Sequence, residues 1–294
     1  MKTLPAHLKS LSDKGFESEA ARQDPLENLC RFRDHGITHL HFSTYWTREV
    51  PITEAEIAMW EAALAESGVQ VLDVHGYHSK KFGQLWDADP ARRDVARTQH
   101  LARLELCRRW GCDAMVVHVP TGMPEVGADT VTRFLDELAA MEERARACGV
   151  VVALENHYHA HSDQQTMSAA FARFDADYIG FCFDPGHALI SGNTDWLLAN
   201  ALPRLKVLHL NDNDGEQDQH WLPLQGYGTA DWQRIVTAIG ESPYDKPLQM
   251  EVSWQEARHA AYDDFLAEAA QVADSLVAQI RGICDEDLTK LGNS

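Results

Sequence analysis

Seven short apolar or β-branched runs recur along the chain, and this repetition constrains the fold more than any other feature. Each run has the length of a strand, and most of them end in polar residues. The runs occupy residues 37–43, 69–76, 113–120, 150–156, 179–187, 205–212 and 248–254. The distances between them have the scale of strand–helix units, so the sequence predicts a repeated α/β architecture.

The segments between the runs have the apolar periodicity and the end signals of helices. Thr53 is a candidate N-cap, and a glycine ends each of the clearest helical patterns. These patterns cover residues 25–36, 52–68, 94–111 and 128–149. Because parallel strands need long crossover connections, strands that alternate with helices predict a parallel sheet.

We predict that this sheet closes into a (β/α)8 TIM barrel. A strand within residues 4–12 would bring the number to eight, although AHLKSLS contains no clean apolar run. An open doubly wound sheet is the alternative, but no GxGxxG or P-loop motif follows any run. No low-complexity linker divides the chain. We therefore expect residues 1–294 to form a single TIM-barrel domain, with residues 255–294 as its C-terminal closing helix and tail.

The residues that end the runs indicate a functional site, because barrels of this kind form their active site at the C-terminal ends of the strands. A single polar residue at a strand end is usually a turn or cap residue. Here an imidazole or a carboxylate ends six consecutive runs, which turn chemistry alone does not explain. The residues in question are His75, His118, Glu155, Asp184 with His187, His209 and Glu251.

Four of these residues together offer a mixture of oxygen and nitrogen ligands, from three carboxylates and one imidazole. They are Glu155, Asp184, His209 and Glu251. Such a set suits Mn²⁺, Mg²⁺, Co²⁺ or Zn²⁺. No cysteine is placed to contribute a thiolate, which argues against a structural zinc site. We predict one divalent metal ion, and a second metal is an open alternative.

Four segments resemble the xylose-isomerase-like barrels, a superfamily of sugar-phosphate isomerases and epimerases, inosose dehydratase-like lyases and zinc-dependent AP endonucleases. The segments are ALENH (153–157), GFCFDPGHALISG (180–192), VLHLNDNDGEQDQHWLPLQGYGTADW (207–232) and LQMEV (248–252). This resemblance implies that Glu155, Asp184, His209 and Glu251 carry the catalytic metal. It also implies that His187 contacts the substrate or the metal beside Asp184.

The activity that the resemblance implies is that of a metal-dependent sugar or polyol isomerase or epimerase. Glu155 and Glu251 would remove and return a proton on either side of a metal-stabilised enediolate. A keto-sugar or inosose dehydratase or lyase on the same site is the alternative. Ketose 3-epimerases usually carry an arginine a few residues after the histidine that corresponds to His209, whereas residues 211–214 are Asn-Asp-Asn-Asp here. QGYG occupies residues 225–228, where Gly-Glu-Gly is often found. Both departures argue against a free ketohexose as the substrate.

Two less favoured alternatives are an AP endonuclease-type phosphodiesterase and a non-enzymatic subunit. With Asp218 and His220 included, the candidate residues match the ligand types of a trinuclear endonuclease site. The net charge of −19 and the lack of an evident basic stripe argue against DNA binding. A non-enzymatic subunit would be expected to lack a metal ligand, and none of the four is missing. Asp218 and His220 are therefore candidates for a second metal or for substrate hydroxyls.

Several other histidines have plainer interpretations. In LENHYHAH the strand should end near Asn156, so His157 is expected to line the pocket, whereas His159 and His161 are expected in a loop. His39 and His41 lie on one side of the first run, and either could reach the pocket, but we interpret them as satisfied interior histidines. Trp46 follows the first run, and Tyr77 and Trp86 follow the second, where they could stack on a sugar ring or pack on the surface.

The composition restricts the kinds of molecule that the protein is expected to bind. The acidic charge disfavours nucleic acids and anionic membrane surfaces, and no apolar run reaches the roughly 18 residues needed to span a membrane. The six cysteines form no CxxC pair, and the first residues lack the apolar core of a secretory signal. We expect a cytoplasmic protein that acts on a small carbohydrate or polyol; whether it forms a homo-oligomer is left open.

Overall fold

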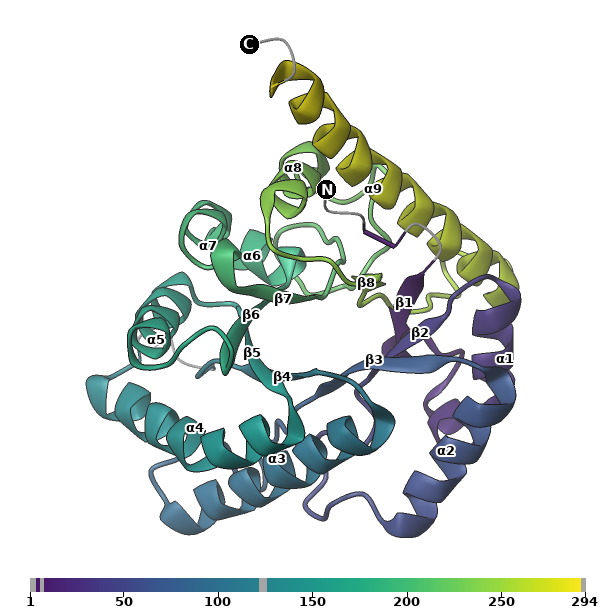
Figure 1. Ribbon diagram of the computed structural model, residues 1–294. Coiled ribbons are helices and arrows are strands. Elements are labelled where there is room, and N and C mark those ends of the chain that lie inside the picture. The colour runs from purple at the N-terminus through teal and green to yellow at the C-terminus, as the bar shows by residue number, and fades with distance from the viewer. Residues whose placement is uncertain (1–3, 6–7, 122–125, 292–294) are drawn as a thin grey trace.

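The computed structural model describes residues 4–5, 8–121 and 126–291. Eight parallel strands surround a central axis and alternate with helices that cover the outside (Figure 1). The sheet order is β7-β6-β5-β4-β3-β2-β1-β8. The strands are β1 (Lys9–Ser12), β2 (His39–Phe42), β3 (Gln70–His75), β4 (Ala114–His118), β5 (Val151–Glu155), β6 (Ile179–Phe183), β7 (Leu205–Leu208) and β8 (Leu248–Met250).

The barrel closes just beyond the end of β7, where Leu210 forms a parallel bridge with Met250. The N–H of Leu210 donates to the carbonyl of Gln249 at 3.3 Å, and the N–H of Glu251 donates to the carbonyl of Leu210 at 3.0 Å. The predicted (β/α)8 TIM barrel is therefore confirmed, and the open doubly wound sheet is excluded.

The helices follow the predicted patterns closely. Thr53 caps its helix in a reciprocal capping box with Glu56, and Gly68, Gly111 and Gly149 end theirs in the left-handed region. The third helix begins before residue 94 because Asp89 caps it and Pro90 occupies its first position. The helices are α1 (Leu26–Asp34), α2 (Glu54–Ser67), α3 (Pro90–Trp110), α4 (Ala128–Cys148), α5 (Ala160–Arg173), α6 (Pro185–Ser191), α7 (Thr194–Asn200), α8 (Trp232–Glu241) and α9 (Tyr262–Leu291), with 3₁₀ turns η1 (Asp13–Gly15), η2 (Glu19–Arg22) and η3 (Leu202–Arg204).

The first strand, β1, lies within the segment predicted for it and pairs with both β2 and β8. Only Leu11 among its residues joins the hydrophobic core. Ser10 is buried, and its hydroxyl donates to the side-chain carbonyl of Gln249 at 3.3 Å. The strand lacks an apolar run because its inward side belongs to a polar sector of the barrel interior.

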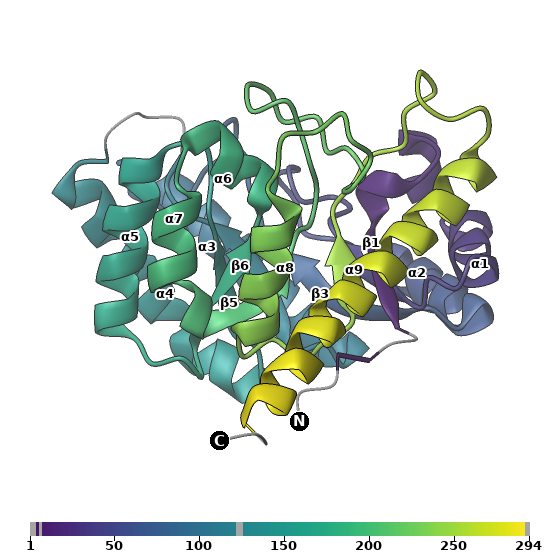
Figure 2. The ribbon, with the colours of Figure 1, turned by 90° about the horizontal axis from the view of Figure 1, so that it is seen from above.

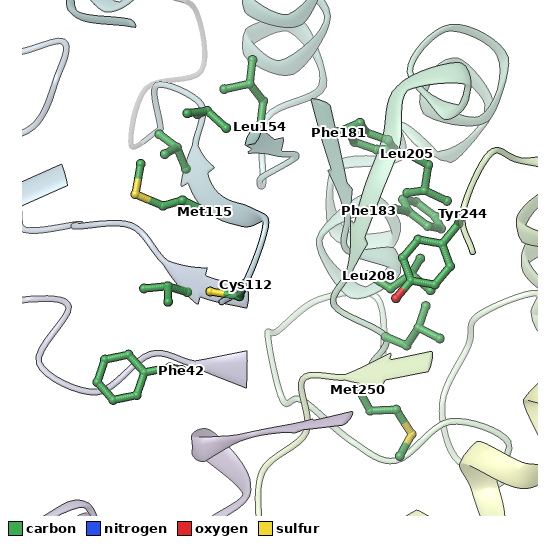
Figure 3. Close-up of a cluster of buried hydrophobic side chains, with 14 of the residues drawn as sticks. Phe42, Cys112, Met115, Leu154, Phe181, Phe183, Leu205, Leu208, Tyr244 and Met250 are labelled. Atoms are coloured by element: carbon green, nitrogen blue, oxygen red, sulfur yellow. The ribbon is translucent and has the colours of Figure 1, made fainter. Parts of the chain in front are cut away.

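The two faces of the strands differ in side-chain size. The larger cluster of apolar side chains includes Met115, Leu154, Phe181 and Met250, which Figure 3 shows on several neighbouring strands. A separate cluster consists of the small residues Ala114, Val116, Ala153, Cys182 and Val207. Four polar residues each follow one of these small residues by two positions along the chain: His118, Glu155, Asp184 and His209. The period of two along each strand therefore brings this second set to the interior at one end of the barrel.

Helix α9 runs beside α8 and α1 (Figure 1) and buries Phe265, Leu266 and Leu276. It lies within residues 255–294, where we predict the closing helix and tail. That residues 1–294 form a single domain stays a prediction. Among the described residues, none of the helices combines the length and apolar character that crossing a membrane requires.

The loops after β7 and β8 extend from the same end of the barrel, together with the residues that follow β1 (Figure 2). The loop after β7 is anchored by Asp212, which is 3% exposed. Its carboxylate accepts the backbone N–H groups of Asn213, Thr229 and Ala230 at 2.9–3.1 Å and the indole N–H of Trp232 at 2.7 Å. This one carboxylate therefore ties the start of the loop to its end.

We expect Asp212→Ala to lower the free energy of unfolding by about 3 kcal/mol, because four donors, two of them buried, would lose their acceptor. Asp212→Asn keeps one acceptor oxygen and should cost less. Urea denaturation measures both variants. Asp177→Ala, at an exposed position, is the control and should stay within about 0.5 kcal/mol of the unsubstituted protein. An Asp212→Ala loss no larger than that of the control would contradict the anchoring role.

Candidate metal centre

Four side chains converge at the C-terminal end of the barrel from four neighbouring strands. Glu155 ends β5, Asp184 follows β6, His209 follows β7 and Glu251 follows β8. One ligand atom from each lies within 4.8 Å of the corresponding atoms of the other three. The Nδ1 atom of His209 is 3.0 Å from Oε1 of Glu155 and 3.5 Å from Oε2 of Glu251. The structure therefore gathers the four residues predicted from the sequence into one buried group, here called the central cluster.

The central cluster has the properties of a cation site. All four side chains are buried, yet Oε2 of Glu155 and Nε2 of His209 have no hydrogen-bond partner. Burying carboxylate charge without compensation is costly, and a divalent ion among these oxygens and the imidazole would supply it. Three carboxylates and one histidine are ligands that Mn²⁺, Mg²⁺, Co²⁺ and Zn²⁺ accept. The residues present thus fit a divalent metal.

The charges in the central cluster act strongly on one another. Burial would lower the pKa of His209, but Glu155 and Glu251 outweigh it and raise that pKa to about 9. Burial would raise the pKa of Glu155, but His209 and His118 hold it well below its usual range. Burial dominates at Asp184 and raises its pKa. The carboxylates of the cluster thus favour a positive charge in their midst, which a divalent ion would also supply.

His75 and His118, at the ends of β3 and β4, form a second group with Glu155. Their Nε2 atoms lie 3.5 Å and 3.0 Å from Oε2 of Glu155. Burial lowers the pKa of His75 to about 3, and its Nδ1 lies 2.9 Å from the carbonyl of Gly76. A neutral imidazole that donates from Nδ1 directs the lone pair of Nε2 toward the carboxylate. Two acceptors that face each other in this way are suited to share a cation.

His187, Asp218 and His220 form a third group, here called the outer cluster. Nε2 of His187 is 3.5 Å and Nε2 of His220 is 2.9 Å from Oδ2 of Asp218. The backbone N–H of His187 donates to Asp184, which caps α6, so this histidine also touches the central cluster. The structure thus brings nine of the ten predicted site residues into three adjoining ligand groups.

The tenth predicted residue, His157, lies beside these groups without belonging to one. Its ring contacts those of His187 and Tyr158, with centroids 4.8 Å and 3.9 Å apart, and its Nδ1 is 2.8 Å from the hydroxyl of Thr121. The backbone N–H of His157 donates to Asp163. His157 therefore lies in the wall of the pocket rather than among the ligand groups.

The remainder of LENHYHAH divides much as expected. Strand β5 ends at Glu155, one residue before the predicted end. His159 is the N-cap of α5, outside the strand, and shares no ligand group with Glu155. The prediction that His161 lies in a loop is wrong, because it occupies the first turn of α5, where it is exposed. The alternate histidines therefore do not form a local metal site.

A pocket of about 210 Å³ opens onto the clusters. It is large enough for a small polar ligand, and side chains from several strands and loops line it. Of the three aromatic residues with open interpretations, Trp46 lines this pocket, whereas Tyr77 and Trp86 do not. The lining residues are Lys14, Trp46, His78, Lys80, His118, Thr121, Glu155, His157, Tyr158, His187, Asp218 and Glu251.

The sequence analysis missed Lys14, which lies directly in the site. Its Nζ atom is 3.1 Å from Oε1 of Glu251 and 3.1 Å from Nε2 of His220. Lys14 lies in η1, directly after β1, where a helical turn no longer follows the alternation of a strand. The strand period that places Glu155 therefore does not predict the position of Lys14.

His41 approaches the site, which is the alternative that the sequence left open. It is buried and its Nδ1 contacts the carboxylate of Asp73, as expected of an interior histidine. However, its Nε2 has no hydrogen-bond partner and lies 4.0 Å from Oε1 of Glu251. Its ring centroid is 4.5 Å from that of His209. His41 therefore lies directly beneath the central cluster.

Comparison with known proteins identifies related chains and similar folds. A family model described as xylose isomerase-like TIM barrel matches residues 29–275. The uncharacterized protein y4fM of Sinorhizobium fredii (strain NBRC 101917 / NGR234) is 26% identical over 254 residues, covering 76% of this chain and 79% of the relative.

Three solved structures share the fold at low identity. A D-tagatose 3-epimerase-like protein has a TM-score of 0.72 and 16% identity, covering 96% of this chain and 99% of that chain. The 3-keto-D-glucoside 4-epimerase YcjR from E. coli has a TM-score of 0.68 and 20% identity, covering 94% and 99%. The IOLI protein with a bound zinc atom has a TM-score of 0.67 and 17% identity, covering 93% and 97%.

Proposed function

Because the chain belongs to the xylose isomerase-like TIM barrel family, we propose that it is a divalent-metal-dependent isomerase or epimerase of a sugar or polyol. The observation that carries the proposal is the position of Glu155 and Glu251. Both carboxylates belong to the central cluster, and both also line the pocket. They can therefore act on a substrate held directly above the metal ligands.

The proposed reaction moves a proton on the carbon next to a carbonyl. A divalent ion held by the central cluster would draw electron density from that carbonyl and acidify the neighbouring C–H bond. Glu155 and Glu251 come from β5 and β8, on either side of His209. We assign proton removal to one of these carboxylates and proton return to the other. Return to the opposite face gives epimerisation, whereas return to the neighbouring carbon gives isomerisation.

Other pocket residues would orient the substrate. The indole of Trp46 presents an apolar surface beside His75 and His118, at ring-centroid distances of 4.4 Å and 5.7 Å. Such a surface suits the C–H face of a sugar. The hydroxyl of Tyr158 donates to Asp218 at 2.7 Å and so orients that carboxylate at the pocket wall. The pocket thus offers both apolar and hydrogen-bonding surfaces to a polyhydroxylated ligand.

Proteins of similar fold support this substrate class. The D-tagatose 3-epimerase-like protein and the 3-keto-D-glucoside 4-epimerase bear the names of sugar epimerases, and the IOLI structure contains zinc. We propose a carbohydrate or polyol substrate and one metal in the central cluster, with room for a second beside His75 and His118.

The proposal is tested by solvent exchange. Metal-stripped protein is reloaded separately with Mn²⁺, Mg²⁺, Co²⁺ and Zn²⁺ and incubated in heavy water with ketoses, inososes and 3-keto-glycosides. We expect deuterium next to the carbonyl of at least one substrate class, only with metal present. NMR and mass spectrometry detect exchange, while loss of water from the substrate would indicate the alternative lyase. Absence of both from every metal-loaded sample contradicts the proposal.

A phosphodiesterase is the second candidate, and the observation that favours it is the presence of three adjoining ligand groups. Three metal ions there could position water and stabilise the charge that develops on a phosphodiester. The net charge of −19 opposes the approach of a nucleic acid. Cleavage of an abasic-site duplex by the zinc-loaded protein, without any sugar exchange, would favour this candidate instead.

A further inference from the structure

The outer cluster faces a cation that belongs to the chain itself. The Nδ1 of His220 lies 2.8 Å from the backbone carbonyl of Glu251, so this nitrogen carries the proton and donates. The lone pair of Nε2 is then directed toward the space shared with Asp218 and Lys14. Nε2 is 2.9 Å from the carboxylate of Asp218 and 3.1 Å from the ammonium of Lys14. A lone pair and a carboxylate this close require a positive charge, and Lys14 supplies one.

Lys14 is held in this place by the residues before it. Asp13 is fully buried, and its carboxylate accepts the backbone N–H groups of Ser43 and Thr44 at 2.9 Å and 2.8 Å and the hydroxyl of Thr44 at 2.7 Å. The hydroxyl of Ser12 accepts the backbone N–H of Lys14 at 3.1 Å. The turn that carries Lys14 is therefore fastened to the loop after β2.

Lys14 also balances the charge of Glu251, whose Oε1 is 3.1 Å away. The ammonium thus bridges the central and outer clusters. A divalent ion bound through Nε2 of His220 would lie against this ammonium, and the two positive charges would repel each other at short range. The outer cluster can therefore hold either the ammonium of Lys14 or a metal ion, but not both.

We infer that Lys14 takes the place of a metal ion in the outer cluster. His187, Asp218 and His220 then bind no metal in the native chain, although they have the residue types of a metal site. The ammonium instead presents N–H donors to oxygen atoms of the ligand in the pocket. The inference rests on the proposed function, because it assumes a divalent ion in the central cluster. It also disfavours a reaction that needs three metals.

The test counts metal ions rather than turnover. Metal-stripped chains are saturated with Zn²⁺, passed through a desalting column and analysed for zinc and protein by mass spectrometry. We expect Lys14→Met to bind one more zinc per chain than the unsubstituted protein. Lys14→Arg keeps the charge and should show no gain. Lys80→Met, which removes another lysine from the same pocket, is the matched control and should also show none.

The double variant Lys14→Met/His220→Ala locates the additional zinc. It should return to the count of the unsubstituted protein, whereas His220→Ala alone should leave that count unchanged. Equal counts for Lys14→Met and the unsubstituted chain overturn the inference, as does the same gain in Lys80→Met or retention of the gain in the double variant. An unsubstituted chain that binds no zinc contradicts the proposed function, and the inference falls with it.

Discussion

Replacing Glu251 by glutamine is expected to slow the exchange of the substrate proton with heavy water by about 10³-fold. Glutamine preserves the size of the side chain but cannot accept a proton. In the unsubstituted protein, burial would raise the pKa of Glu251, but Lys14 and then His209 outweigh it and keep the carboxylate charged. The variant thus removes the charged oxygen that we place beside the substrate.

Because Glu251 also belongs to the central cluster, its replacement could slow exchange through loss of the bound metal. Two measurements distinguish that effect from loss of proton transfer. Metal content is determined on the same samples, and exchange is measured over a range of metal concentrations. Glu256→Gln, at an exposed position shortly after β8, is the matched control and should exchange at the normal rate. Undiminished exchange in Glu251→Gln would rule out the proposed proton transfer.

A divalent metal is expected to raise the thermal unfolding temperature of the metal-stripped chain, and Asp184→Asn should abolish this effect. A ligand present at 1,000 times its dissociation constant stabilises the folded state by about 4 kcal/mol. For a chain of this size that corresponds to roughly 8 °C. Asp184 supplies one of the three carboxylates of the central cluster, and its charge compensates a metal where an amide cannot.

Asparagine suits this test because it can also cap a helix. The Oδ1 of Asp184 accepts the backbone N–H of His187 at 2.8 Å, an interaction that an amide oxygen can retain. The metal-free variant should therefore remain folded. Asp177→Asn, on the surface, should keep the full metal-induced shift. A shift of the same size in Asp184→Asn would show that the metal binds elsewhere.

Most of the barrel could be predicted because its signals are local. The capping box at Thr53 and the left-handed glycines at 68, 111 and 149 mark helix ends within a few residues of the chain. The start of α3 was placed too late because its cap, Asp89, precedes the apolar pattern. Strand β1 was the hardest strand to recognise, because its buried Ser10 is hydrogen-bonded to Gln249, which is distant in the sequence.

The candidate site could be predicted in part for the same reason. Glu155 and His209 each stand one alternation step beyond a small interior residue, so the strand period alone places them at one end of the barrel. Alternation did not reveal His41 as a neighbour of Glu251, because the approach depends on the curvature that brings β2 and β8 to either side of β1. The metal-binding and catalytic roles of Glu155, His209 and Glu251 stay predictions.

Residue order was therefore sufficient for the eight parallel strands and for most of the residues that reach the open end of the barrel, since those properties repeat over a few positions of the chain. Closure of the barrel decided which of these residues meet. Lys14 and His220 are 206 positions apart, yet their nitrogens lie within 3.1 Å. No local pattern encodes that contact, because it exists only when the first and last strands pair and bring opposite ends of the chain to one pocket.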